Sequence, residues 1–356
     1  MKTMYVRFVN VMTILFIFMS MPMLAQEKEK IVEKIFAEYK GDKPGVSAAV
    51  FHNGKIVFTY VSGLADLEKG TLITPETNFR LASFSKQFTA MCVMILKEEG
   101  KLNYTDNLCD FFPDFPAYGK KITVKNLFNH TSGLLDYEDL LTDTAYQVLD
   151  SDVLEIMKGV DSTYFETGTQ FRYSNTAYAL LAMIVEKVSG KKFSQFMKEK
   201  VLDPLEMNNS VEFREGENQV PNRAYGYAQK DNTFVFSDQS TTSAVWGDGG
   251  LYSSTVDIFK WDQALYTEKL IKKETLMEAY TPTVLSTREN TGYGYGWYID
   301  VYKGLKRVYH TGDTCGFRTI FQRYPEKNFS VVVLVNRREP EMIQYANQLT
   351  DLFLLD

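Results

Sequence analysis

The chain has 356 residues and a formal net charge of −6, from 39 basic and 45 acidic residues. No basic tract follows the first residues, so the composition argues against binding to a nucleic-acid backbone. The cysteines are too few and too widely spaced for a disulfide scaffold, which leaves either one disulfide or three free thiols (Cys92, Cys109 and Cys315). The histidines show no metal-binding spacing, so no metal site is expected (His52, His130 and His310).

Residues 1–25 have the pattern of an export signal. Lys2 and Arg7 give a positive start, an interrupted apolar run follows to Leu24, and Ala25 is small enough for a cleavage site. The run is short for a membrane-spanning helix, and no later stretch is long and apolar enough. We expect a secreted or periplasmic protein without a stable membrane span, and an N-terminal anchor is the alternative.

The predicted elements change in character along the chain. A helix is expected over 27–40, followed by a hairpin at 46–52 and 55–61, because Asn53-Gly54 between two β-rich runs favours a tight turn. The middle of the chain is mostly helical, with helices expected at 83–99, 176–189, 192–202 and 254–267. Short strands are expected next, at 293–302, 306–311, 316–324 and 328–336, before a last helix at 340–355.

This order predicts an α+β fold. The early hairpin joins the late strands in one antiparallel sheet, the two terminal helices flank that sheet, and the middle of the chain forms a helical lobe. The expected mature domain, 26–356, divides into an α/β lobe from about 26–82 and 285–356 and an all-helical lobe from about 83–284. A site is expected in the cleft between the lobes.

Ser83-Phe84-Ser85-Lys86 is the first candidate for chemistry, an SxxK pattern at a helix start. Residues three apart share a helix face, so Lys86 can reach the Ser83 hydroxyl, whereas Ser85 faces elsewhere. A serine hydroxyl is a poor nucleophile until a base takes its proton, and a buried lysine with a lowered pKa can do so. A capped helix with a surface lysine is the alternative interpretation.

Two further motifs carry polar groups suited to catalysis. Tyr173 beside a buried lysine would lose its proton more easily and act as base and later as acid, and Asn175 can bind a substrate amide. At the end of a late strand, His310-Thr311-Gly312 ends on a glycine that permits close backbone approach, and the Asp313 N–H can join that of Ser83 in an oxyanion hole. Each motif alone also fits an ordinary helix cap or strand end.

SxxK early, YxN in the helical middle and HTG on a late strand together resemble the serine β-lactamase and penicillin-binding superfamily. The likeness is greatest to the branch of class C β-lactamases and DD-peptidases. It covers about residues 30 to 350, and the connecting segments that carry it are Phe79–Ser83, Leu127–Leu134, Trp246–Ser253 and Val308–Phe317. The resemblance implies a β-lactamase/transpeptidase-like fold and acyl-enzyme chemistry without a metal or other cofactor.

By the same resemblance, Ser83 attacks a carbonyl group and Lys86 and Tyr173 move protons. The expected substrate contacts are Asn175, His310, Thr311 and Gly312, with Asp313 at the oxyanion. His310 stands where class C β-lactamases usually carry lysine, and because histidine is mostly neutral near pH 7 the site has less fixed positive charge. Arg318 is either a carboxylate contact in its place or a solvated strand residue.

The expected function is an exported serine hydrolase that forms an acyl-enzyme on Ser83 and cleaves peptides or amides containing D-amino acids, as a DD-carboxypeptidase does. A broad-specificity esterase and a class C-like β-lactamase are alternatives with the same mechanism. A penicillin-binding sensor with little turnover is an alternative of another class. A Ser–His–Asp hydrolase using His130 lacks the expected GxSxG elbow. In every case the partner is a small-molecule or peptide substrate.

Overall fold

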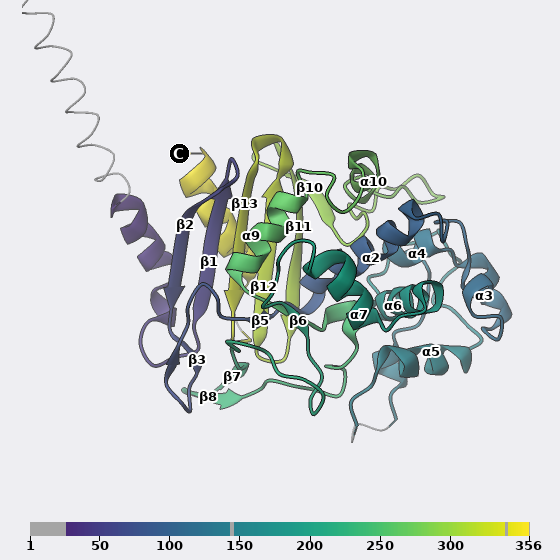
Figure 1. Cartoon of the computed structure of the whole chain (residues 1–356), viewed down its shortest axis with the longest axis horizontal. Helices are drawn as coiled ribbons and strands as arrows, with labels where there is room; N and C mark the ends of the chain where they lie inside the picture. The colour runs from purple at the N-terminus through teal and green to yellow at the C-terminus, as the bar shows by residue number, and fades with distance from the viewer. Residues whose placement is uncertain (1–25, 143–145, 339–340, 356) are drawn as a thin grey trace, which may run out of the picture.

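The computed structural model describes residues 26–142, 146–338 and 341–355. The first lobe is built on an antiparallel sheet in the strand order β10-β11-β12-β13-β1-β2, seen in the left half of Figure 1. The sheet strands are β1 Val46–His52, β2 Lys55–Ser62, β10 Tyr298–Tyr302, β11 Leu305–Thr314, β12 Phe317–Tyr324 and β13 Phe329–Val335. Val46 pairs with Val335, so the early hairpin does join the late strands, as predicted. The predicted export segment, residues 1–25, lies outside the described residues.

The late strands differ from the prediction at their ends. β11 continues past the expected end at residue 311 to Thr314, because its register with β12 runs on to the pair of Thr314 and Phe317. The HTG motif therefore lies inside a strand and not at its end. β10 begins at Tyr298, since the residues before it turn through Gly296, whose φ of +79° favours glycine.

Helices cover both faces of the sheet, which explains why every residue of β13 is buried. One face packs against a helix at 26–35, α11 (Met342–Thr350) and the π-helical turn η7 (Asp351–Leu355), so both terminal helices cover the sheet, as predicted, and they share one face of it. The opposite face packs against α2 (Lys86–Glu98) and α9 (Thr255–Ala264).

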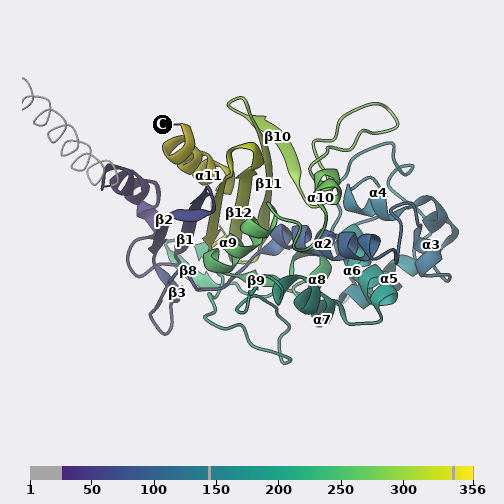
Figure 2. The ribbon, with the colours of Figure 1, turned by 45° about the horizontal axis from the view of Figure 1, so that its top comes forward.

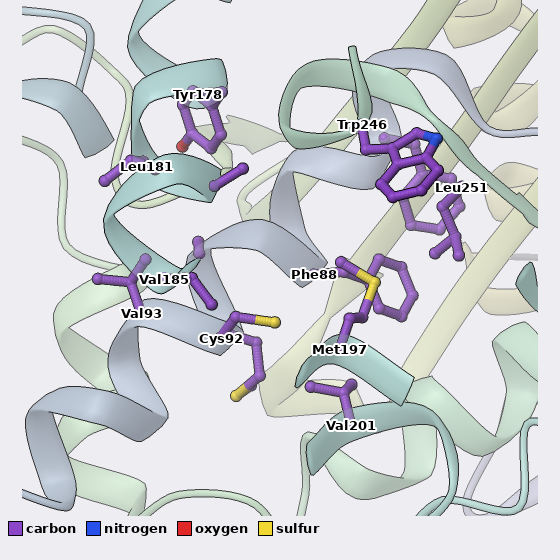
Figure 3. Close-up of a cluster of buried hydrophobic side chains, with 14 of the residues drawn as sticks. Phe88, Cys92, Val93, Tyr178, Leu181, Val185, Met197, Val201, Trp246 and Leu251 are labelled. Atoms are coloured by element: carbon purple, nitrogen blue, oxygen red, sulfur yellow. The ribbon is translucent and has the colours of Figure 1, made fainter. Parts of the chain in front are cut away.

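The second lobe is built around α2 and α6, which contact each other directly. Figure 2 shows α2 reaching from the sheet into this lobe, and Figure 3 shows the buried cluster to which Phe88 and Cys92 of α2 and Val185 of α6 belong. The helices are α3 Leu108–Phe111, α4 Val124–Phe128, α5 Asp150–Lys158, α6 Asn175–Ser189, α7 Phe193–Met197 with the π-helical η5 Lys198–Leu202, α8 Trp246–Gly249 and α10 Lys273–Ala279.

The expected all-helical segment 83–284 is not helical throughout. It also contains the short strands β6 Val211–Glu212, β7 Tyr227–Lys230, β8 Thr233–Phe236 and β9 Leu251–Ser253. β9 pairs on one side with β5 (Phe79–Arg80), just ahead of Ser83, and on the other side with β6, and α9 packs on β1 and β13 of the large sheet. The chain therefore returns from the second lobe to the sheet well before residue 285.

The structure also decides between the cysteine alternatives. Cys92 is buried, Cys109 and Cys315 are partly buried, and all three are free thiols. Within the described ranges, no helix is long and apolar enough to cross a membrane.

Candidate active site

Ser83 lies in a 3₁₀ turn, η2 (Ala82–Ser85), that leads directly into α2. Ala82 has a φ of +51°, a left-handed conformation that is strained for a residue with a Cβ and is often found beside functional groups. Phe84 stacks on Phe321 of β12 at 5.3 Å, which fixes the turn against the sheet. The Ser85 hydroxyl is buried and accepts from Leu251 N at 3.3 Å, whereas Ser83 is partly exposed. Of the two serines, only Ser83 can meet a substrate.

Lys86, three residues on, is fully buried and donates three hydrogen bonds. Its Nζ lies 3.0 Å from Ser83 Oγ, 2.8 Å from Asn175 Oδ1 and 2.7 Å from the carbonyl oxygen of Asp248. Burial lowers the pKa of Lys86 to about 8, against the opposing charges of Asp248 and Glu138. Lys86 is thus within reach of the Ser83 proton and has a pKa near the working range of a base.

Tyr173, in the loop before α6, contributes a buried aromatic ring beside Lys86. Its ring centroid lies 4.9 Å from Lys86 Nζ. Among the described residues the hydroxyl makes no hydrogen bond of ordinary length, although the neighbouring Ser83 acts to lower its pKa. Burial outweighs Ser83 and raises the pKa of Tyr173 well above its ordinary value. The expectation that Lys86 makes this phenol easier to ionise is therefore wrong for the free enzyme.

Asn175 is the first residue of α6, whose start is capped by Ser174 Oγ accepting from Ala177 N at 3.1 Å. The Asn175 side chain is already paired at both ends. Its carbonyl accepts from Lys86, and its amide donates to Glu138 Oε1 at 2.9 Å. Glu138 is exposed, so a carboxylate stands at the mouth of the site beside the YxN motif.

His310 is brought to the site but is buried, with only 1% of the residue exposed. Its Nε2 lies 2.9 Å from the Tyr293 hydroxyl and its Nδ1 2.6 Å from the Thr311 carbonyl oxygen, so Nδ1–H donates and Nε2 accepts. Burial and the nearby Lys86 lower the pKa of His310 to about 3. The ring is therefore neutral, and both of its nitrogens are already hydrogen-bonded within the protein.

The two faces of β11 have different roles. Gly312 faces the nucleophile turn, where an added Cβ would lie 2.0 Å from the Leu81 carbonyl oxygen. Side chains alternate along a strand, so Thr311 and Asp313 point to the other face. There Asp313, which is largely exposed, forms an ion pair with Arg318, its cross-strand partner. The Asp313 carboxylate and the Arg318 guanidinium therefore lie on the side of the strand away from Ser83.

His130 is a structural residue. It is fully buried among aromatic rings, and its Nδ1 accepts from Ser174 N at 3.1 Å. Burial lowers its pKa well below the ordinary value, so it does not form a charge-relay triad with Ser83. In the described part of the chain, no group of three or more acidic, histidine or cysteine residues could hold a metal ion.

Sequence reasoning missed two groups that adjoin Lys86, the Asp248 carbonyl and the Glu138 carboxylate. The segment Trp246–Ser253, which contains Asp248, carries the family resemblance in the sequence but no predicted role in the site. Glu138 follows the HTSGL segment in the acidic stretch Asp136–Asp139, and nothing in that stretch distinguishes Glu138 from its acidic neighbours.

Comparison with known proteins agrees with this geometry. The Beta-lactamase family model matches residues 31–354. Penicillin-binding protein 4* of Bacillus subtilis is 32% identical over 341 residues, which span 91% of this chain and 75% of that protein. The octameric penicillin-binding protein homologue from Pyrococcus abyssi superposes with a TM-score of 0.78 at 28% identity, covering 93% of this chain and 78% of that one.

A third similar protein, the D-amino acid amidase from Ochrobactrum anthropi, has a TM-score of 0.77 at 22% identity and covers 92% of this chain and 96% of that one, a likeness of fold. The family model spans nearly the whole described chain. In this chain the serine and the lysine of the SxxK motif are hydrogen-bonded to each other. The chain therefore belongs to the β-lactamase family of serine hydrolases.

Proposed function

We propose that the chain hydrolyses amides or peptides containing D-amino acids through an acyl-enzyme on Ser83. The observation that carries this proposal is the 3.0 Å hydrogen bond between Ser83 Oγ and a buried lysine of lowered pKa. That pair provides a nucleophile and a base without any third group.

In the acylation step, neutral Lys86 takes the Ser83 proton while Oγ bonds to the substrate carbonyl carbon. The N–H groups of Ser83 and Asp313 stabilise the oxyanion, in keeping with the packing of β11 on the nucleophile turn. Tyr173 then gives its proton to the leaving nitrogen and regains one from Lys86. Water attacks the acyl-enzyme by the reverse proton path and releases the acid. The raised pKa of Tyr173 supports the donor role.

The charges at the site favour an amidase over a DD-carboxypeptidase. A carboxypeptidase needs a cation for the terminal carboxylate of its substrate, but His310 is neutral and Arg318 pairs with Asp313 on the opposite face of β11. Glu138 beside Asn175 suits a protonated amino group instead. A D-amino acid amide with a free amine has that group and no carboxylate, and the fold likeness to a D-amino acid amidase is consistent with it.

Intact-mass spectrometry with a fluorophosphonate probe and a labelled penicillin tests the nucleophile. Both reagents should add one label to the wild type and to the Ser85→Ala control, and none to Ser83→Ala. Substrate preference is tested by comparing D-amino acid amides, an acyl-D-alanyl-D-alanine peptide, a phenyl ester and a chromogenic cephalosporin. Labelling by the fluorophosphonate alone, with turnover of the ester alone, would favour the esterase. A penicillin adduct without turnover of any of the four would favour the sensor, and no labelling refutes the proposal.

Residues 1–25 also support export of the protein to the periplasm or the outside of the cell. The support is the sequence pattern alone. Expression of the full chain in a bacterial host, followed by fractionation and N-terminal sequencing, should give an exported protein that begins near Gln26. A protein retained in the cytoplasm with its first residues intact would contradict this.

A further inference from the structure

The acceptor that completes the surroundings of Lys86 is a backbone oxygen outside the predicted catalytic motifs. The bond from Lys86 Nζ to the Asp248 carbonyl, at 2.7 Å, is the shortest of its three hydrogen bonds. A carbonyl of the main chain cannot rotate away as a side chain can, so its position depends on the turn that carries it. That turn is α8.

α8 has four residues, too few to be stable by themselves, because a helix of one turn costs more in chain entropy than its hydrogen bonds return. It lies between α2 and α6 and is held from both sides. Thr89 Oγ1 of α2 donates to the Gly247 carbonyl at 2.8 Å. On the other side, a Cβ at Gly247 would lie 2.4 Å from the Tyr178 carbonyl of α6. Trp246 belongs to the buried cluster drawn in Figure 3, together with Phe88 of α2.

The first two N–H groups of α8 both end on one buried carboxylate. Asp150, the first residue of α5, is 7% exposed. Its Oδ2 accepts from Trp246 N and its Oδ1 from Gly247 N, both at 2.9 Å. Two parallel bonds from one planar group fix the direction of the turn as well as satisfying two donors.

We propose that Asp150 is a positioning residue for Lys86. The carboxylate of Asp150 holds α8 in place, so that the Asp248 carbonyl oxygen accepts a hydrogen bond from the lysine ammonium. This inference rests on the proposed function, because the role of Lys86 as a base gives the contact its meaning. Among the described residues, Asp150 makes no hydrogen bond to Ser83 or Lys86, so its effect passes through α8.

The charges around the contact set the sign of the expected effect. The carbonyl stabilises the ammonium form, so displacing it should lower the pKa of Lys86. Burial raises the pKa of Asp150 to about 7, with the Asp248 carboxylate acting in the same direction. Asp150 is thus ionised mainly above neutrality, where Lys86 begins to lose its proton. The other titratable groups that face these two residues are Glu138 of η4 (Tyr137–Leu140), Tyr137, His130, Tyr173, Tyr178, His310 and Glu212 of β6.

The test measures the pKa of Lys86 directly, by NMR titration of protein labelled with ¹³C at lysine Cε, with Lys86→Gln used to assign the signal. The key variant is Asp150→Asn, which keeps the size of the side chain but turns an amide NH₂ toward a backbone N–H. The matched control is Asp152→Asn, which removes the same charge from the same turn of α5. Asp152 accepts from Leu149 N at 2.9 Å and makes no hydrogen bond to α8 in the part of the chain that the structure describes.

We expect the Lys86 pKa to fall by about one pH unit in Asp150→Asn, the size of one lost hydrogen bond to a charged group, and to be unchanged in Asp152→Asn. A lower unfolding midpoint with an unmoved Lys86 pKa would mean a merely structural role and overturn the proposal. If Asp150→Asn does not fold, Thr89→Val replaces it, because this change loosens the same turn from the α2 side. Thr89→Val should lower the Lys86 pKa by the same amount, and an unchanged Lys86 pKa overturns the proposal equally. Failure of the proposed function is distinct, since it appears as an unlabelled Ser83 in the wild type.

Discussion

The pH dependence of acylation follows from the burial of Lys86. Only the unprotonated amine accepts the Ser83 proton, so the rate should rise with pH through the lysine pKa of about 8 and level off above it. At pH 7 about one tenth of the amine is then free, against about one part in 3,000 for a lysine of ordinary pKa. Burial therefore raises the amount of base at neutral pH by roughly 300-fold.

The assay is the second-order rate of fluorophosphonate labelling from about pH 5 to about pH 10, corrected for hydrolysis of the probe. A single rising limb with a midpoint near pH 8 is expected in the wild type. Lys86→Gln should label at least 10²-fold more slowly at the plateau and without that limb. A limb that persists unchanged in Lys86→Gln, or one centred near the ordinary histidine value of about 6.5, would refute the assignment of the base.

Three substitutions test other parts of the structure. Tyr173→Phe should slow turnover by about 10²–10⁴-fold by removing the proton donor, and an unchanged steady-state rate would assign both proton transfers to Lys86. Gly312→Ala should cost about 10²-fold in labelling rate, because its Cβ would lie 2.0 Å from the Leu81 carbonyl and push β11 off the nucleophile turn; wild-type labelling would contradict that packing. Arg323→Met should lower the free energy of unfolding, measured in urea, by about 3–5 kcal/mol, because the buried Asp262 carboxylate loses its ion-pair partner. A loss below about 1 kcal/mol would disprove that pairing.

The sequence was informative where local pattern and chemistry coincide. Asn53-Gly54 located the first hairpin, and the apolar spacing after Ser174, ended by Gly190, located α6 almost to the residue. The SxxK spacing placed Lys86 against Ser83, although through a 3₁₀ turn and not an α-helix. In each of these cases neighbouring residues alone determine the structure.

Features that depend on contacts between distant segments could not be read in this way. No local signal tells that Asp150 reaches Trp246, or that Glu138 pairs with Asn175. The end of β11 was misplaced because its last residues are held by pairing with β12 and not by their own propensity. The pKa of Tyr173 was expected to move the wrong way, because the depth of burial of a side chain is a property of the whole fold.

The order of strands in the large sheet has a consequence for the time course of folding. β1 pairs on one side with β2, which follows it at once, and on the other side with β13, close to the end of the chain. Forming the second pairing requires closure of a loop that contains nearly the whole protein, a slow step with a large entropic barrier. Until β13 arrives, β1 presents an unpaired edge that is prone to mispairing. The sheet behind the nucleophile can therefore be completed only after synthesis of the chain has reached its final strand.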